Sequence, residues 1–127
     1  MVVNIPTKPK GTCVEMNIWA AKSQVGMVLG PSDYMWFFHM VRNGGPWDYK
    51  QGGRQFADFG NFNFGAVGYA MGIPEQILLR AAGWAQSQAG TSASSWSYWW
   101  WLTPYGDDPM DQKMIEAGIQ YAVQRGH

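Results

Sequence analysis

The fold of this chain is decided by the stretch Phe62-Asn63-Phe64-Gly65-Ala66-Val67-Gly68-Tyr69-Ala70-Met71-Gly72. The pattern predicts an α-helix, and Gly65, Gly68 and Gly72 recur at spacings of three and four, which places them on one face. Glycine inside a helix costs about 1 kcal/mol relative to alanine. Three glycines on one face therefore indicate that another element, or a ligand, approaches the backbone closely there, and close packing is the simpler of these two explanations.

Two helices are expected before this stretch. The first covers residues 13–24, because Thr12 and Glu15 have the spacing of a capping box and an apolar stripe follows them. The second begins where Ser32 or Asp33 caps it, and it ends at the glycines of residues 43–46.

Two further helices are expected after it. One begins at Pro74, which suits a first helical position, and it runs to about residue 88. The other has Asp108 as its cap, Pro109 as its first residue and Gly126 as its stop. The segment between them is rich in serine and then densely aromatic, and the pattern leaves a short strand and a packed apolar plug equally open.

Residues 47–60 are too polar and too interrupted by glycine for a core helix, so we interpret them as a loop or a short hairpin. The fold class that follows is mainly α, or α+β through that small hairpin, with about five helices in a lysozyme-like arrangement. Residues 1–11 are expected to form a linker and residues 12–127 one domain, because a second core would leave each half too small.

The composition narrows the classes of function. Of 127 residues, 46% are hydrophobic and 14% charged, and nine basic side chains balance nine acidic ones. A chain with this balance lacks the broad positive field that attracts nucleic acids. A few Lys and Arg residues gathered in one cleft could still bind them, and the net charge does not reveal such a cluster. Cys13 is the only cysteine, so no disulfide framework is expected. The first ten residues lack the apolar run of a signal peptide, and no run is long enough to cross a bilayer.

Four short runs together resemble a known family. They are FHMVRNGGPWDYK at residues 38–50, DFGNFNFGA at 58–66, AAGWAQ at 81–86 and PYGDDP at 104–109. The combination resembles the bacterial polymorphic toxin type 44 family. The resemblance implies the C-terminal toxin module of a larger secreted effector, which is delivered into rival bacteria and is neutralised in the producer by a cognate immunity protein.

Carboxylates are the first candidates for chemistry. Glycoside hydrolysis needs two carboxyl groups that flank the scissile bond, and Asp58 and Asp48 lie together in the polar region after the second expected helix. Asp58 is the leading candidate. Glu15 follows as a general acid whose pKa burial against tryptophan would raise, although its capping role already explains it. Lys50 lies on the family motif and either acts on substrate or holds the loop by pairing with Asp48 or Asp58.

Substrate binding is expected from residues that combine flat rings with hydrogen-bonding groups. Such side chains suit a peptidoglycan strand, because aromatic rings stack on sugar faces while amides and hydroxyls bind acetamido groups and hydroxyls. The candidates are Trp47, Tyr49, Asn61, Asn63, Gln86 and Tyr105.

A ribonuclease is the alternative, and it would use His39 with cations from Arg42, Lys50 and Arg54. Carboxylates of the same regions would suit a hard cation, but their spacing is not diagnostic, so no metal or cofactor is expected. The sequence therefore predicts a peptidoglycan-hydrolysing toxin that acts in the target periplasm without inserting into a membrane. Nucleic acid becomes its partner, and the cytoplasm its place of action, only under the alternative.

Overall fold

The structure is a computed structural model that describes residues 2–127. Within that range the chain forms five α-helices and three short 3₁₀ turns, with no β-strand. The mainly α prediction is therefore confirmed. The helices are α1 (Val14–Gln24), α2 (Pro31–Val41), α3 (Ala57–Met71), α4 (Glu75–Gln88) and α5 (Pro109–Gln124), and the 3₁₀ turns are η1 (Tyr49–Gly52), η2 (Arg54–Phe56) and η3 (Ser94–Trp96).

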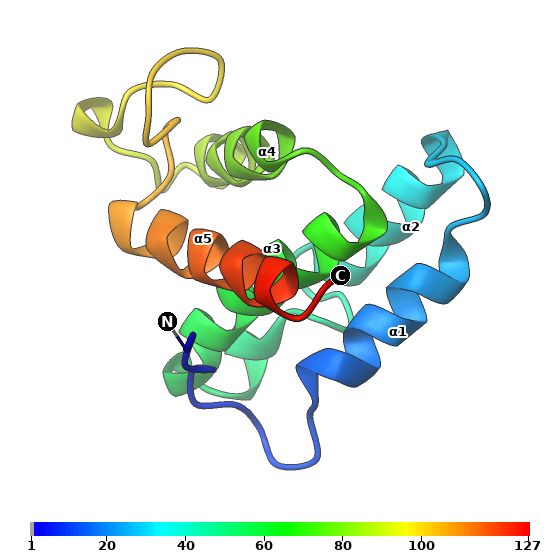
Figure 1. The fold of residues 1–127 in the computed structure, drawn as a ribbon. Helices are drawn as coiled ribbons and strands as arrows, with labels where there is room; N and C mark the ends of the chain where they lie inside the picture. The colour runs from blue at the N-terminus through cyan, green and yellow to red at the C-terminus, as the bar shows by residue number, and fades with distance from the viewer. Residues whose placement is uncertain (1) are drawn as a thin grey trace.

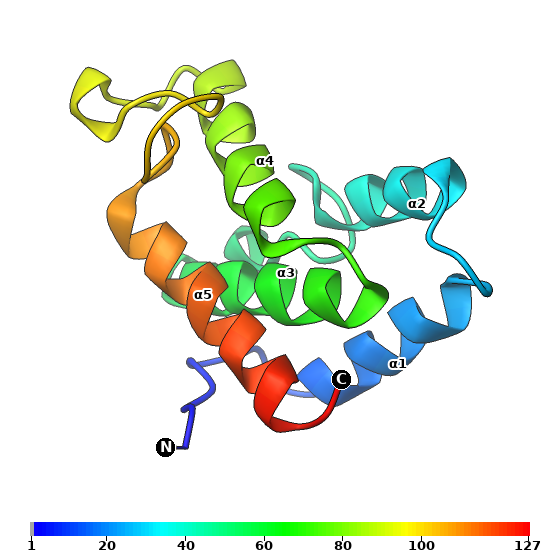
Figure 2. The same cartoon turned by 45° about the horizontal axis from the view of Figure 1, so that its top comes forward.

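Helix α3 is the centre of the domain. In both views it lies among the other four helices, with α5 crossing it, α1 on one side and α4 on another (Figures 1 and 2). Its buried side chains include Phe59, Phe62 and Val67, and they pack in one core with residues such as Ile18 of α1 and Ile115 of α5. A helix buried on several sides explains why the central stretch is apolar or glycine at nearly every position.

The close packing predicted from the glycines is present where α3 crosses α5. A Cβ atom added to Gly65 would overlap the backbone carbonyl of Ile115, and one added to Gly118 would overlap the carbonyl of Phe62. Each helix thus presents a glycine to the backbone of the other. The two glycines let the helix axes approach more closely than any side chain would permit.

The other two glycines of the stretch have different neighbours. Gly68 faces the side chains of Leu78 on α4 and Phe37 on α2. Gly72 ends α3 in a left-handed conformation, with φ of 100°, which favours glycine. Close packing therefore accounts for Gly65 and Gly68, and helix termination accounts for Gly72.

Of the loop and the short hairpin that were left open for residues 47–60, the hairpin is absent. Successive turns replace it, because Gly53 N donates to Lys50 O and Phe56 N donates to Gly53 O, each at 3.0 Å. Such local bonds tighten the backbone into 3₁₀ turns instead of pairing two strands. Helix α3 then begins at Ala57, earlier than expected, which places Asp58 in its first turn.

The capping box expected at α1 is also absent. Cys13 is the N-cap residue and its side chain makes no capping hydrogen bond. Glu15 points instead toward the C-terminal end of α5, where it accepts a hydrogen bond from the Tyr121 hydroxyl at 2.6 Å. The Glu15 carboxylate, which the local pattern placed in a capping box, therefore makes a contact between α1 and α5 instead.

The start of α5 matches its prediction. Asp108 is the N-cap residue, its Oδ1 accepts from Met110 N at 2.8 Å, and Pro109 is the first helical residue. Helix α2 differs slightly, since Gly30 is its N-cap residue and Asp33 accepts from Gly30 N. In residues 2–127 no helix combines the length and the apolar character that a bilayer-spanning segment requires.

Gly65→Ala is expected to destabilise the domain, because the new methyl group meets backbone that cannot move aside. Overpacking of this kind costs roughly 1–3 kcal/mol, measured as the free energy of unfolding in urea. Gly60→Ala is the matched control on the same helix, where an added Cβ meets nothing within 4 Å. At Gly60 the higher helix propensity of alanine is expected to raise the free energy of unfolding by about 1 kcal/mol. Equal changes in the free energy of unfolding for the two variants would contradict the close crossing of α3 and α5.

Candidate active site

Four aspartates gather where the N-terminal ends of α3 and α5 approach each other. Asp58 lies in the first turn of α3, Asp111 lies in the first turn of α5, and Asp108 caps α5 with Asp107 just before it. We call these four residues the acidic site. Helix N-termini favour carboxylates through their exposed N–H groups and dipoles, so each position is locally favourable even though the charges repel one another.

Asp111 lies within electrostatic reach of Asp58 and Asp108. Burial raises the pKa of Asp111, and the negative charges of Asp108 and Asp58 raise it further, while Lys50 opposes them. Asp58 itself is exposed, whereas Asp111 is partly buried. The site therefore holds an exposed carboxylate beside a carboxyl group whose ionisation is disfavoured.

Asp107 is the buried member of the acidic site. Its side chain is 3% exposed, and its Oδ2 accepts a hydrogen bond from Gln112 Nε2 at 2.8 Å. Burial raises the pKa of Asp107 to about 6, with a further increase from the charges of Asp111 and Asp108. The neighbouring Gln112 Oε1 is buried without a hydrogen-bond partner among the described residues. Asp107 thus gains and loses its proton close to pH 6.

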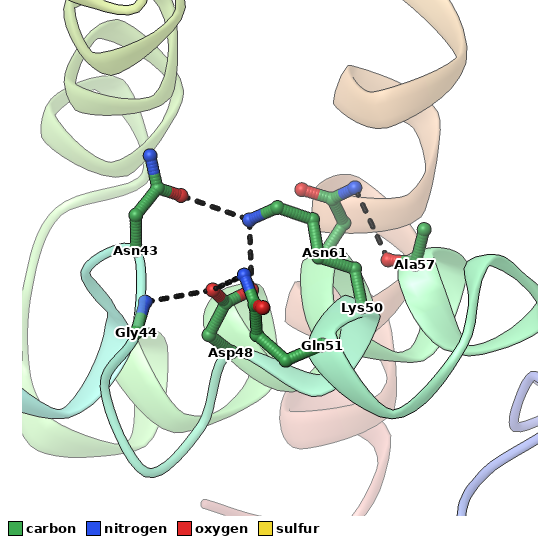
Figure 3. A network of polar contacts seen from close by, with 7 residues as sticks. All are labelled: Asn43, Gly44, Asp48, Lys50, Gln51, Ala57 and Asn61. Carbon is green, nitrogen blue, oxygen red and sulfur yellow. Dashed lines mark hydrogen bonds and ion pairs between the residues drawn. The ribbon is translucent and has the colours of Figure 1, made fainter.

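Asp48 stands apart from the acidic site and holds the turn between α2 and α3 (Figure 3). Its Oδ2 accepts from Gly44 N at 2.8 Å and from Gln51 Nε2 at 2.9 Å. Its Oδ1 pairs with Lys50 Nζ at 2.7 Å. Burial tends to raise the pKa of Asp48, but the hydrogen bonds from Lys50, Gly44 and Gln51 outweigh it and lower the pKa. Asp48 is therefore an ionised carboxylate with its oxygens already occupied.

Lys50 links this turn to the acidic site. Its Nζ donates to Asp48 Oδ1 and also to Asn43 Oδ1 at 2.8 Å, and its charge lowers the pKa of Asp111 (Figure 3). Half of the Lys50 side chain is exposed. Of the two roles left open by the sequence, the structure shows the pairing with Asp48.

Glu15 lies at the opposite end of α5. Tyr121 O–H donates to Glu15 Oε1 at 2.6 Å, and His127 Nε2 lies 3.0 Å from Oε2. The Tyr121 hydrogen bond lowers the pKa of Glu15 against the opposing effect of burial, so the expected increase was wrong. Tyr121 follows Asp111 by ten residues, or about 15 Å of helix, so Glu15 does not join the acidic site.

Three of the six expected substrate-binding residues are structural. Trp47 is buried in the core and packs edge-on against Trp36. Asn17 Nδ2 donates both to the Tyr49 hydroxyl and to Asn63 Oδ1, each at 2.8 Å. Asn63 is fully buried. These contacts tie η1, α1 and α3 together and bury Trp47 and Asn63, while Tyr49 stays half-buried.

Two of the others, Gln86 and Asn61, lie nearer to the surface. Gln86 donates to Thr91 Oγ1 at 2.8 Å and accepts from Asp108 N at 3.4 Å, so it borders the acidic site from α4. Asn61 follows Asp58 by three residues and shares its face of α3. Asn61 Nδ2 makes a long bond of 3.4 Å to the carbonyl oxygen of Ala57 (Figure 3).

Tyr105 is a buried residue beside α4. Its hydroxyl donates to Gln76 Oε1 at 3.3 Å, and the Arg80 guanidinium lies 4.5 Å from the centre of its ring. These contacts use both the polar end and one face of the side chain. Tyr105 therefore fixes the segment that leads into Asp107 and has little free surface for substrate.

The residues of the ribonuclease alternative are exposed. His39 lies on α2, Arg42 directly follows that helix, and Arg54 lies on η2. None of the three makes a side-chain hydrogen bond within residues 2–127.

Two surface hollows lie away from the acidic site. One runs along Tyr69–Pro74 beside His127, and the other lies beside Tyr121. Across the described residues no group of three or more His, Cys, Asp or Glu side chains could hold a metal ion.

Asp111 is the residue that sequence reasoning missed. Its position in the first turn of α5 had an ordinary explanation, since acidic residues favour helix N-termini. Only the crossing of α3 and α5 brings it near Asp58. The glycine spacing was the available signal, because it indicated that some element packs on α3, although it did not identify α5.

A comparison with known families adds an independent finding. A sequence model of the family described as bacterial toxin 44 matches residues 51–124, more than half of the 127-residue chain. The matched region contains α3, α4 and α5 and all four aspartates of the acidic site. Neither a curated protein nor a solved structure matches the chain.

Asp107→Asn is expected to make the domain more stable at neutral pH. The folded pKa of about 6 exceeds the ordinary value of 3.8, so the folded protein binds the proton more tightly and loses stability as the pH rises through this interval. One pKa unit corresponds to about 1.4 kcal/mol, which sets an upper limit of about 3 kcal/mol for the loss.

The measurement is the melting temperature of both proteins between pH 4 and pH 7.5. Wild type should lose stability between pH 4 and pH 6 by more than the variant does, and their difference should be smallest at pH 4. Parallel curves for the two proteins would show that Asp107 titrates in the folded state as it does in the unfolded chain.

Proposed function

Because this chain belongs to the bacterial toxin 44 family, we propose that it kills bacteria by hydrolysing the glycosidic bonds of peptidoglycan. One observation carries the proposal: the exposed carboxylate of Asp58 lies close enough to Asp111 to raise its pKa. Glycosidases require such a pair, in which one carboxyl group keeps its proton and the other is ionised.

The two carboxyl groups have environments that suit different roles. Asp111 is partly buried and has a raised pKa, so it is the proton donor to the oxygen of the leaving sugar. Asp58 is exposed, and it acts on the sugar carbon directly or through a water molecule. The positive charge of Lys50 offsets part of the negative charge of the site and lowers the pKa of Asp111.

The charge of the site favours a glycan over RNA. Four aspartates would repel the phosphates of a nucleic acid, and the positive field needed to offset this is missing because the net charge is zero. Lys50, whose charge acts on Asp111, is already paired with Asp48. A sugar strand has no backbone phosphate and meets no such repulsion.

The proposed substrate determines the compartment in which the toxin acts and the partners it needs. Peptidoglycan lies outside the inner membrane, so the domain acts in the target-cell periplasm after delivery as the C-terminal part of a larger effector. The producing cell then needs a cognate immunity protein in that same compartment. Cofactors have no part in this reaction, because two carboxyl groups and water are sufficient for it.

The test of the site uses Asp58→Asn and Asp111→Asn, with Glu116→Gln as the matched control. Glu116 is an exposed carboxylate on α5, five residues beyond Asp111. Loss of an acid or base typically costs 10²–10⁴-fold in rate. We therefore expect each aspartate variant to release sugar ends from purified sacculi at least about 100-fold more slowly, with the folded state retained and Glu116→Gln unchanged.

Directed expression distinguishes the two substrates. Export to the periplasm should lyse cells, and expression confined to the cytoplasm should be tolerated. Killing from the cytoplasm together with cleavage of total RNA by the purified domain would overturn the glycan proposal in favour of the ribonuclease. Full toxicity of Asp58→Asn would remove Asp58 from the proposed mechanism.

A further inference from the structure

The segment Thr91–Gly106, which we call the aromatic loop, leaves an unusual number of large side chains in solvent. In both views it lies at the end of the domain away from α1, in yellow to orange (Figures 1 and 2). Isolated exposed apolar residues are ordinary, but a contiguous group of them marks a binding surface. The exposed fractions are 50% for Tyr98, 42% for Trp99, 58% for Trp100, 55% for Trp101 and 61% for Leu102.

The rings of this loop are ordered into a stepped stack. The centroids of Tyr98 and Trp100 are 5.3 Å apart with planes 9° from parallel. Those of Trp100 and Trp101 are 5.9 Å apart with planes 6° from parallel. Parallel rings at these separations are offset, so each ring leaves part of its face uncovered. The stack therefore presents several flat faces in one orientation.

The loop is fastened to α4 beneath the stack. Arg80 Nη1 donates to the carbonyl oxygens of Trp99 at 3.0 Å and Trp101 at 3.1 Å. Gly83 allows the backbone of Tyr105 to lie directly against the helix, where any Cβ would overlap the Tyr105 carbonyl. These contacts fix the backbone that carries the rings, so binding does not have to order it.

A second set of bonds closes the loop on itself. Gly106 N donates to Trp96 O at 2.7 Å, and Ser92 Oγ donates to Gly106 O at 2.6 Å. A closed loop with fixed ends loses less entropy when a ligand binds than an open one. The segment after Gly106 is Asp107 and Asp108, so the loop leads directly into the acidic site.

The charge of the loop limits what can bind it. Residues 91–106 contain no Asp, Glu, Lys, Arg or His. The adjacent cation, Arg80, already contacts two carbonyl oxygens and the Tyr105 ring. Acidic lipid headgroups and nucleic-acid phosphates would therefore find no positive partner here. The surface fits a neutral ligand with flat apolar faces.

Sugar rings have that chemistry. The axial C–H groups of a β-linked pyranose form a flat apolar face that covers an aromatic ring, while its hydroxyl and acetamido oxygens accept hydrogen bonds. The indole N–H groups of Trp99, Trp100 and Trp101 have no hydrogen-bond partner within residues 2–127, so they are available as donors.

We propose that the aromatic loop is a glycan-binding platform on which consecutive uncharged sugar rings stack against Trp100 and Trp101. This inference rests on the proposed function, since it supplies the subsite that holds the strand whose cleavage the acidic site performs. The platform binds sugars whether or not the bond is cleaved, so the two proposals can be tested separately.

The experiment measures binding in the Asp58→Asn chain, which the proposed function predicts to be inactive. Insoluble chitin, an uncharged polymer of N-acetylglucosamine, and purified sacculi serve as the two glycan probes, and sedimentation gives the bound fraction. Trp100→Ala and Trp101→Ala are each expected to weaken binding to both probes about tenfold. Trp19→Ala is the matched control, because Trp19 is 59% exposed but lies on α1.

Each result either supports or overturns the platform. Weakened binding in the two loop variants, with unchanged melting temperature and an unaffected Trp19 variant, supports it. Equal binding by all variants, or no binding of the parent chain to either glycan, overturns it. Binding of the parent to neutral or anionic lipid vesicles but not to glycans would instead assign the loop to a membrane. Glycan binding without hydrolysis by the wild type would retain the platform and refute the proposed reaction.

Discussion

The crossing of α3 and α5 is the constraint on which the rest of the structure depends. Gly65 and Gly118 each face the backbone of the opposite helix, so neither position tolerates a Cβ. Close approach at this point determines how far apart the two helix starts lie. Because α3 begins at Ala57 and α5 at Pro109, the same crossing brings the first turns of both helices, with Asp58 and Asp111, within electrostatic reach of each other.

Two opposing effects meet at those helix starts. Each exposed set of backbone N–H groups favours a nearby carboxylate, which makes aspartate a suitable residue at both places when each helix is considered alone. Bringing the two starts together adds repulsion between the carboxylates, and partial burial adds a desolvation cost to Asp111. The result is a raised pKa at Asp111, produced by two locally ordinary N-terminal patterns and one tertiary contact.

The sequence predicted those features whose causes are local. Helix α5 was predicted through its Asp108 cap and Pro109, and the glycines of α3 correctly indicated close packing. The short hairpin, one of two alternatives for residues 47–60, is absent because polarity and glycine content alone do not distinguish paired strands from successive 3₁₀ turns. Asp58 was selected from the polar region after the second helix and Lys50 from the family motif. The missed Asp111 and the misassigned cap at Glu15 both depend on contacts between residues far apart in sequence.

The two ends of α5 differ in how well their charged groups are paired. At the C-terminal end, Glu15 accepts from Tyr121, pairs with His127 and so fastens α1 to α5 with satisfied polar groups. At the N-terminal end, aspartates repel one another and Asp107 is buried with a raised pKa, which lowers stability at neutral pH. The buried core along α3 and the contacts at Glu15 stabilise the fold and offset this cost.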